Sequence, residues 1–159
     1  MTAMTEPIID LVRGLPAADA SAILALGRPL ALRDGETLFP VGAPADALYV
    51  IRRGLIALTF PLALAGRDED VVIEEHVAGE TLGWSALVPP HRFTLKGIAP
   101  EGAEVLEISR HALLGYCASH PDAGFVVGMN IAATIGHRLQ LFQAMWLRQV
   151  QHAVSRAHA

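Results

Sequence analysis

The residues of this sequence best suited to bind a charged ligand lie in one stretch, 80-ETLGWSALVPPHRFT-94. It combines glycine, two prolines and several hydroxyl residues with a single arginine, Arg92. A guanidinium group can hold phosphate or another anion through a planar fork of charge-assisted hydrogen bonds. Arg92 could therefore capture an anion, or it could be a solvated turn arginine or an ion-pair partner of Glu80. The sequence leaves both interpretations open.

Catalytic chemistry has little support. The chain contains no G-x-S-x-G elbow, no P-loop, and no H-E-x-x-H or G-x-G-x-x-G motif. Ser85, His91 and Asp46 could be assembled into a triad, but most chains of this size offer such a combination. A cupin-type metal enzyme would need histidines and a carboxylate clustered on neighbouring strands, and the sequence does not show that pattern. We therefore expect no enzymatic activity.

Metal and cluster sites are also poorly supported. The single cysteine, Cys117, cannot hold an iron–sulfur cluster, which needs several thiolates. The seven histidines lack a metal-ligand spacing. His76, on a predicted strand, and His91, in the stretch described above, give only weak support for a haem or a metal ion. The sequence predicts no resident metal or cofactor.

Composition indicates one globular domain. Of 159 residues, 52% are hydrophobic and 18% are charged, which allows a sizeable core. The longest apolar run, 54-GLIALTFPLALAG-66, is too short to cross a membrane. The first ten residues lack the basic and apolar regions of a signal peptide. Because a lone cysteine cannot form an internal disulfide, we expect a cytoplasmic protein.

Charge is distributed unevenly along the chain. Residues 1–122 contain nine basic and all sixteen acidic residues, whereas residues 123–159 contain three arginines and no acid. Three arginines in this segment are too sparse for a DNA-binding stripe, so we do not expect direct DNA contact.

Secondary structure is predicted to change twice along the chain. Apolar groups in residues 1–28 favour short helices, the second preceded by Pro16 and closed by Gly27. From 29 to 108, turn signals every 8–12 residues separate short β-favouring runs, which is typical of a sandwich, barrel or roll. A turn is predicted at 53-RG-54 and another at 65-AGRDED-70. The predicted strands are 36–39, 47–53, 55–60, 71–77, 93–99 and 103–109.

Residues 109–156 are predicted to be helical. A short helix covers 109–118, and a second begins at 119-SHPDAG-124, with Ser119 as its N-cap and Pro121 in its first turn. The second helix extends to about residue 155, roughly 45 Å or more at 1.5 Å per residue, which is longer than a small roll can cover. We therefore expect a homodimer through this helix, although it could instead fold back on its own roll. Its apolar stripe comprises Val127, Ile131, Ile135, Leu139, Phe142 and Trp146, widened by Leu141 and Met145.

The segment 35-GETLFPVGAPADALYVIRRGLIAL-58 resembles the cyclic-nucleotide-binding domain superfamily, most closely the sensory domain of the Crp/Fnr group of bacterial regulators. In the second half, 79-GETLG-83, 104-EVLEISR-110 and the long final helix also match. The resemblance covers roughly residues 20–150. It implies an antiparallel, jelly-roll-like β-roll flanked by helices, with the final helix serving for dimerisation. The matching turn glycines and strand positions in the first half are Gly35-Glu36, Phe39, Gly42, Ala45-Asp46, Leu48-Tyr49-Val50-Ile51 and Gly54.

By this resemblance, residues 80–94 are the phosphate-binding cassette. In the family, backbone N–H groups of a short helix face a phosphate, an arginine supplies charge-assisted hydrogen bonds, and a glutamate accepts from the ribose 2′-hydroxyl. Leu82-Gly83 match the start of the motif and Arg92 matches the phosphate arginine. Thr94 could supply a hydroxyl, one residue later than in the pattern. The resemblance thus gives the candidate ligand-binding residues Gly83, Trp84, Ser85, Arg92, Phe93 and Thr94.

The cassette departs from the family pattern where the ligand's sugar would bind. Trp84 stands in place of the glutamate, and no carboxylate occurs between Glu80 and Glu101. An indole is only a donor and cannot replace a carboxylate acceptor. The loss corresponds to roughly 1.5–3 kcal/mol, or about ten- to a hundred-fold in affinity. The loop is also about one residue shorter, and Pro89 and Pro90 remove two donors.

Two functions follow from the sequence, with a cupin-type enzyme as a weaker third. The first is a stand-alone, dimeric regulatory module that binds a small anionic ligand, with cyclic AMP and cyclic GMP as candidates. The second is a dimerisation protein of the same fold whose pocket is filled by Trp84 and Phe93. Crp/Fnr regulators continue into a winged helix-turn-helix. We expect one domain over residues 1–159 without that element, so that this chain is a stand-alone module unless it is part of a longer protein.

Overall fold

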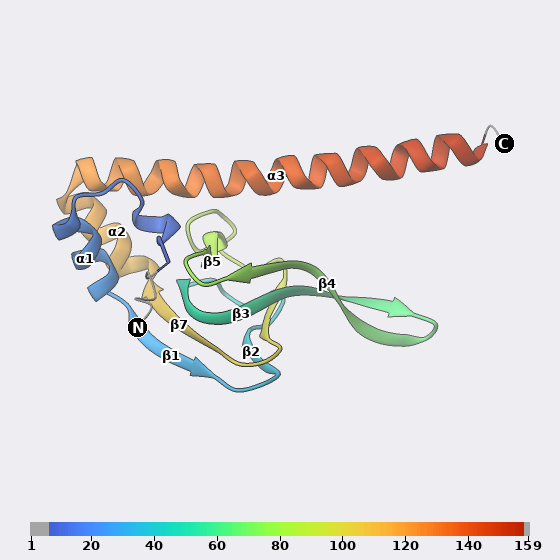
Figure 1. The fold of residues 1–159 in the computed structure, drawn as a ribbon, viewed down its shortest axis with the longest axis horizontal. Coiled ribbons are helices and arrows are strands. Elements are labelled where there is room, and N and C mark those ends of the chain that lie inside the picture. The colour runs from blue at the N-terminus through green and yellow to red at the C-terminus, as the bar shows by residue number, and fades with distance from the viewer. Residues whose placement is uncertain (1–6, 158–159) are drawn as a thin grey trace, which may run out of the picture.

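The computed structural model describes residues 7–157, and within them an antiparallel β-roll lies against a long helix (Figure 1). Residues 1–6, the start of the segment judged not to be a signal peptide, lie outside the described part. The sheet order is β1-β7-β3-β6-β2, and β4 and β5 also pair with β3. The strands are β1 Arg28–Leu32, β2 Glu36–Phe39, β3 Ala47–Leu64, β4 Arg67–Val77, β5 Thr81–Leu82, β6 Lys96–Ala99 and β7 Ala103–Ser109.

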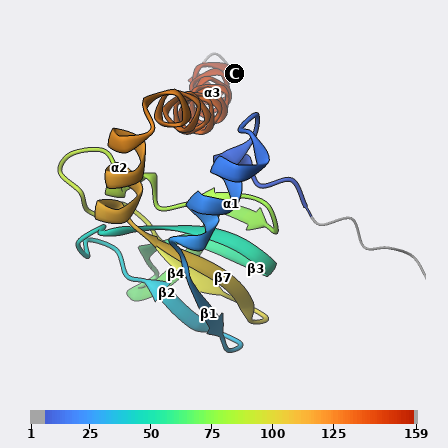
Figure 2. The same ribbon diagram turned by 90° about the vertical axis from the view of Figure 1, so that its left-hand side faces the viewer.

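The helices gather on one side of the roll. Figure 2 shows α1 and α2 between α3 and one end of the strands, and Figure 1 shows α3 running the length of the roll and beyond it. The predicted fold class, a β-roll with short N-terminal helices and a long C-terminal helix, is confirmed. The helices are η1 Asp10–Val12, α1 Ala17–Ala25, η2 Trp84–Ala86, α2 Arg110–Ser119 and α3 Pro121–Ala157, with η1 and η2 of the 3₁₀ type.

Strand β3 forms the spine of the roll and corrects one prediction. The turn expected at residues 53–54 is absent, and one strand continues from Ala47 to Leu64. Gly54 has φ +81°, and the pairing of β3 with β7 shifts its register just before it, between Ile51 and Arg53. Before this glycine β3 pairs with β5 and β7; after it, β3 pairs with β4 and β6. Glycine here turns a strand from one half of the roll into the other, as in a β-bulge, without reversing the chain.

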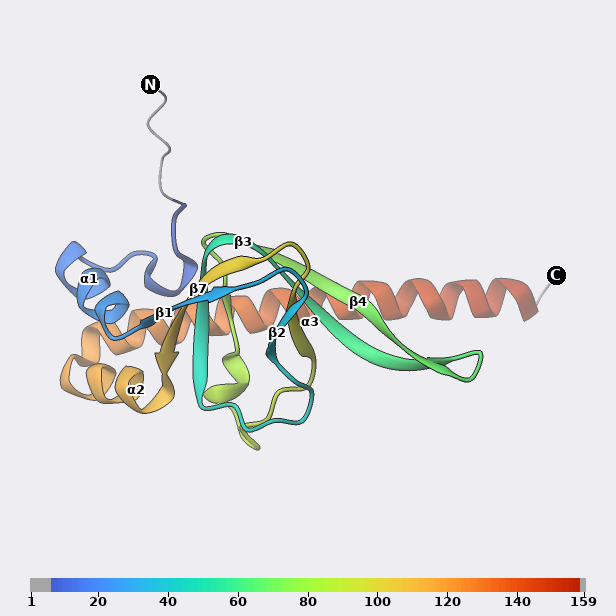
Figure 3. The same ribbon diagram turned by 90° about the horizontal axis from the view of Figure 1, so that it is seen from below.

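Beyond the roll, β3 and β4 continue as a two-stranded hairpin (Figures 1 and 3). Its reversal lies between Leu64 and Arg67, inside the turn predicted at 65–70. The long apolar run of the sequence is therefore a strand with its turn. Among the described residues, no helix has the length and apolarity needed to cross a membrane.

The helix boundaries correct a second prediction. Ser119 does not cap α3; it is the last residue of α2, and its hydroxyl donates to the carbonyl of Gly115 at 3.1 Å. The N-cap of α2 is Ser109, whose hydroxyl accepts from the N–H of Ala112 at 3.3 Å. Pro121 is the first residue of α3, where its missing N–H costs little, as predicted.

Helix α3 divides into a docked half and a free half. Val127 and Ile131, two members of the predicted stripe, are buried against the roll. The side-chain amide of Asn130 donates to the carbonyls of Leu11 at 3.0 Å and Arg13 at 2.9 Å, which ties the helix to the N-terminal segment. From Leu139 to residue 157, every described residue of α3 is exposed. The helix does fold back on its own roll, but only as far as residue 138.

Gly54 gives a test of the corner in β3. We expect Gly54→Ala to lower the free energy of unfolding by about 3 kcal/mol, because a left-handed backbone costs an L-residue about 1–2 kcal/mol and a clash is added. The new Cβ would lie 2.6 Å from the carbonyl oxygen of Gly102. Gly35→Ala is the matched control: φ is +75° and nothing lies within 4 Å of an added Cβ. Equal losses in urea unfolding would show that close packing at the corner contributes nothing.

Candidate ligand-binding site

The first arm of the cassette follows β5. Leu82 pairs with Tyr49 of β3, and Gly83 then turns the chain with φ +83°. A Cβ at Gly83 would lie 2.9 Å from the carbonyl oxygen of Ala47, so this glycine meets a backbone requirement. One turn of 3₁₀ helix follows, in which the N–H of Ala86 donates to the carbonyl of Gly83 at 2.9 Å. This turn stands where the family resemblance implied a short helix.

The second arm pairs with a neighbouring loop and sets the direction of its side chains. The N–H of Phe93 donates to the carbonyl of Ala43 at 3.0 Å, and the N–H of Gly42 to the carbonyl of Phe93 at 2.8 Å. Because side chains alternate along an extended chain, Phe93 points inward and Arg92 outward. The guanidinium of Arg92 donates to the carbonyl of Gly42 at 2.8 Å. Arg92 thus lies on the outer rim of the cassette and does not pair with Glu80.

The space beneath the cassette is small. It amounts to about 20 Å³, close to the room needed by one water molecule and far below the roughly 300 Å³ of small-molecule pockets. Five of the six predicted site residues meet there, and Arg92 is the exception. The cavity is lined by Gly83, Trp84, Ser85, Phe93, Thr94, Phe39, Leu58, Leu95 and Arg138.

Aromatic rings fill the interior beside this cavity. Phe93 stacks on Phe39 with ring centroids 3.9 Å apart and an interplanar angle of 11°. Tyr49 lies 5.6 Å from Phe39 and 6.4 Å from Phe93, measured between centroids. Burial is the main reason that the pKa of Tyr49 is raised to about 12, so its hydroxyl stays protonated at physiological pH. The cluster is apolar in character and presents no anion-binding group to the cavity.

Arg138 of α3 completes the site and was not predicted. Its guanidinium carbon lies 5.4 Å from the centroid of the Trp84 ring, and its Nε donates to Oε1 of Glu74 at 3.1 Å. The side chains of Arg138 and Glu74 are 14% and 15% exposed. Sequence reasoning counted Arg138 only as one of three basic residues in the last segment. The available signal was its place in the apolar stripe, where it continues the steps of Val127 and Ile131.

Glu74 links Arg138 to a histidine and a second carboxylate. The Nε2 atom of His76 lies 2.9 Å from Oε2 of Glu74, and its Nδ1 atom lies 3.4 Å from Oε2 of Glu80. Burial acts to raise the pKa of Glu74, but the hydrogen bond with His76 and the charge of Arg138 outweigh it and hold that pKa below its ordinary value. The ionised carboxylate therefore contributes to the stability of the fold.

The histidines singled out in the sequence have other partners than a metal. His76 contacts the two carboxylates just described, and Nδ1 of His91 lies 3.0 Å from the carbonyl of Ala86. No group of three or more His, Cys, Asp or Glu side chains in residues 7–157 is arranged to hold a metal ion.

An antiparallel β-roll that holds a glycine-led cassette against a long C-terminal helix is the architecture of a cyclic nucleotide-binding domain. The profile of that family matches residues 29–120, more than half of the chain. The chain therefore belongs to the cyclic nucleotide-binding domain family. A search of curated proteins found no significant match.

Solved structures agree on the fold. A cyclic nucleotide-binding domain from Methylobacillus flagellatus KT has a TM-score of 0.77 at 18% identity, covering 89% of this chain and 82% of that one. The catabolite activator protein of Thermus thermophilus has a TM-score of 0.72 at 23% identity over 86% of this chain, which spans 61% of that protein. The N-terminal domain of a transcriptional regulator from Streptomyces coelicolor A3(2) gives 0.68 at 22%, covering 84% and 91%.

The lowered pKa of Glu74 predicts a pH dependence. Its contribution is fully present above the unfolded-state pKa of about 4.3 and is lost as the pH falls through the lower folded-state pKa. We expect Glu74→Gln to lower the free energy of unfolding at pH 7 by about 1–3 kcal/mol, because it leaves the charge of Arg138 without its partner. In urea unfolding, the gap to the wild type should narrow as the pH falls below about 4.3.

Glu104→Gln is the matched control, since Glu104 makes a 3.5 Å pair with Arg53 and its side chain is 56% exposed. Its effect at pH 7 should be small. A gap between wild type and Glu74→Gln that stays constant with pH would contradict the role given to the ionised Glu74.

Proposed function

We propose that this chain is a dimeric regulatory module that binds a small anionic ligand beneath the cassette, with cyclic AMP and cyclic GMP as the first candidates. One observation carries the proposal: five predicted site residues and Arg138 of α3 meet at a single cavity. A ligand that enters there has to displace a side chain of the long helix. Family membership supports the ligand class, and a similar structure, the regulatory domain of Toxoplasma gondii PKA, was crystallised with cAMP.

The contacts of Arg138 suggest how binding would reach the helix. The cavity of about 20 Å³ corresponds to a closed state in which Arg138 covers Trp84 and pairs with Glu74. A cyclic phosphate would compete with Glu74 for a guanidinium, and Arg92 at the rim could exchange the Gly42 carbonyl for the same anion. Because Arg138 is the last partly buried residue of α3, its release would loosen the docked half of the helix. A ligand that prefers the released position shifts the population towards it.

The proposed homodimer rests on a second face of α3. Its members recur at alternating steps of four and three residues, the spacing of a coiled-coil seam. Trp146 is 66% exposed and Leu139 57% exposed. The face lies away from the residues that dock on the roll, so a second copy can pack on it along both halves of the helix. The seam consists of Phe125, Met129, Ala132, Gly136, Leu139, Gln143, Trp146 and Val150.

The alternative, a dimerisation protein whose roll no longer binds a ligand, is favoured by a specific observation. The stacked pair of Phe39 and Phe93 and the indole of Trp84 occupy the interior that a nucleotide would need. Trp84 also offers no acceptor for a ribose hydroxyl. In this alternative Arg138 is a permanent anchor of α3.

Ligand binding is tested by thermal unfolding with and without cyclic AMP or cyclic GMP. At a hundred times its dissociation constant, the ligand should add about 2.7 kcal/mol of stability and raise Tm by about 5–10 °C. We expect Arg92→Ala to abolish most of this rise. The exposed Arg53 is the control, and Arg53→Ala should keep the rise. No rise in the wild type with either nucleotide would overturn the sensor proposal in favour of the filled roll.

Dimerisation is tested by light scattering on the eluting protein. The wild type should have twice the 16.9 kDa mass of the chain, and Leu139→Glu should have the chain mass, because it places unpaired carboxylates in an apolar seam. Ala144→Glu is the matched control: it introduces the same charge on an exposed position of α3 outside the seam. Equal dimerisation of all three proteins would exclude the seam as the interface, and a monomeric wild type would exclude the homodimer.

A further inference from the structure

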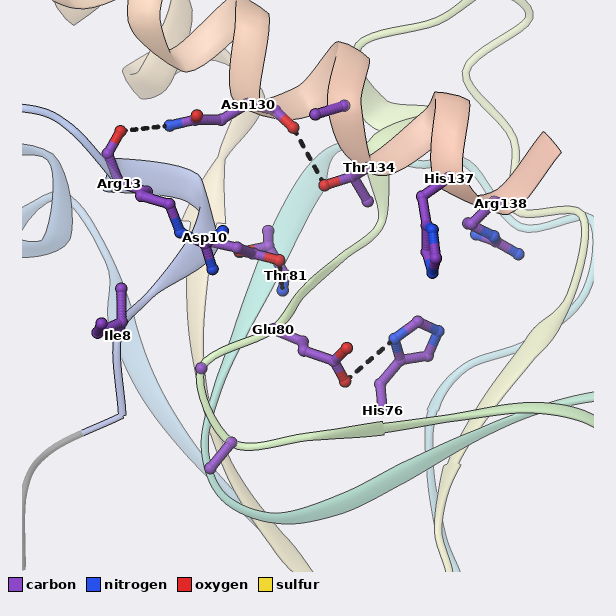
Figure 4. A pocket seen from close by; sticks show the side chains of 13 residues that line it. Ile8, Asp10, Arg13, His76, Glu80, Thr81, Asn130, Thr134, His137 and Arg138 are labelled. Carbon is purple, nitrogen blue, oxygen red and sulfur yellow. Dashed lines mark hydrogen bonds and ion pairs between the residues drawn. The ribbon is translucent and has the colours of Figure 1, made fainter. Parts of the chain in front are cut away.

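A second, larger pocket lies outside the roll (Figure 4). It has a volume of about 330 Å³ and is bounded by the η1 segment, the β4–β5 turn and α3. Of the residues around the cassette cavity, only Arg138 also lines this pocket. Its size falls at the lower end of the range for small-molecule sites, roughly 300–1,000 Å³. The pocket thus meets the site proposed above only at Arg138, and it is large enough for a ligand of its own.

Most polar groups of this pocket already have partners within the protein. Asp10 accepts from the N–H of Thr81 at 3.1 Å and from its hydroxyl. Glu80 accepts from the N–H of Val77 at 2.7 Å and faces Nδ1 of His76. The amide of Asn130 donates to two carbonyls of the N-terminal segment. Each carboxylate has donors from the protein and retains acceptor capacity on its remaining lone pairs.

Two donor side chains of the pocket have no such partner. The guanidinium of Arg13, from the N-terminal segment, and the imidazole of His137, from α3, make no side-chain hydrogen bond or ion pair with the described residues. Figure 4 shows Arg13 on the N-terminal segment and His137 on α3, on opposite sides of Asp10, with Glu80 below them next to His76. The unused capacity is thus of two kinds: donors at Arg13 and His137, and acceptor lone pairs at the carboxylates.

We propose that this pocket binds a small phosphorylated polyol, such as a sugar phosphate. The phosphate lies between Arg13 and His137, because its three outer oxygens can accept from donors on two walls at once. The hydroxyls of the polyol donate to the carboxylates of Asp10 and Glu80. A neutral sugar would leave the guanidinium without an anion. A phosphate alone would leave the carboxylates facing solvent. The phosphate of the ligand therefore pairs with the donors, and its hydroxyls pair with the carboxylates.

Such a ligand would bridge the N-terminal segment and α3. The hydrogen bonds of Asn130 already join these elements one to two turns before His137. The bound phosphate would add a second link close to Arg138, where the docked half of α3 ends. Occupancy of the pocket would thus favour the docked position of the helix. This inference does not require the cassette to bind a nucleotide.

The test is calorimetric titration of the full chain with glucose 6-phosphate and glycerol 3-phosphate, beside inorganic phosphate and glucose. We expect at least one sugar or polyol phosphate to bind, inorganic phosphate to bind at least about ten-fold more weakly, and glucose not to bind. Arg13→Gln and His137→Gln should each weaken binding by about ten- to a hundred-fold. Arg148→Gln, an exposed arginine of α3 outside the pocket, is the control and should leave binding unchanged.

The two variants should fold like the wild type, because the side chains replaced have no partner among the described residues, and their unfolding temperatures without ligand check this. Arg92→Ala should bind the polyol phosphate normally, which separates this site from the cassette. The proposal is overturned if neither phosphorylated polyol binds, if Arg13→Gln and His137→Gln bind as tightly as the control, or if inorganic phosphate binds equally well.

Discussion

The ion pair between Arg138 and Glu74 is the contact on which the rest of the structure depends, because Arg138 also contacts the cassette and so links three elements of the fold. Arg138 belongs to α3, Glu74 to β4, and the ring beneath the guanidinium, Trp84, to the cassette. Both charged side chains are about 15% exposed. Because both side chains are largely shielded from water, separating them would leave two charges uncompensated, which costs free energy. Cassette, sheet and helix are therefore coupled through a single guanidinium.

Much of the roll could be predicted from the sequence because local signals determine most of its strands, although β1 and β5 were not predicted and the strand expected at 93–99 begins only at Lys96. Turn glycines and alternating apolar residues placed β2 and β7 at their observed bounds, and five of the six cassette residues meet at one cavity. The predictions that were wrong concerned features set by residues far apart in the sequence. The pattern at Gly54 predicts a turn, yet β3 continues through this residue and changes its pairing partner from β7 to β4. The outward direction of Arg92 follows from pairing with the 42–45 loop, which no local pattern records.

Helix α3 shows why one apolar stripe was predicted where two faces exist. Val127 and Ile131 face the roll, whereas Leu139 and Trp146 are exposed and belong to the proposed seam. Each four-residue step turns the helix by about 400°, roughly 40° more than a full turn, so the predicted stripe moves by about 120° between Val127 and Leu139 and passes from one face to the other. In the proposed dimer, the docked half of α3 contacts both the roll and the second copy, and the free half contacts only the second copy. Arg138 marks the boundary and could be recognised only once the helix was placed on the roll.

The two proposed sites would have opposite effects on the docking of α3 at Arg138. A ligand beneath the cassette needs Arg138 to leave Trp84 and Glu74, which favours release of the helix. A phosphate between Arg13 and His137 joins α3 to the N-terminal segment one residue away from Arg138, which favours docking. Binding free energies that depend on one equilibrium are linked reciprocally, so each ligand would weaken the affinity for the other by the same factor. If both proposals hold, the position of α3 reports the ratio of two ligands and not the concentration of one.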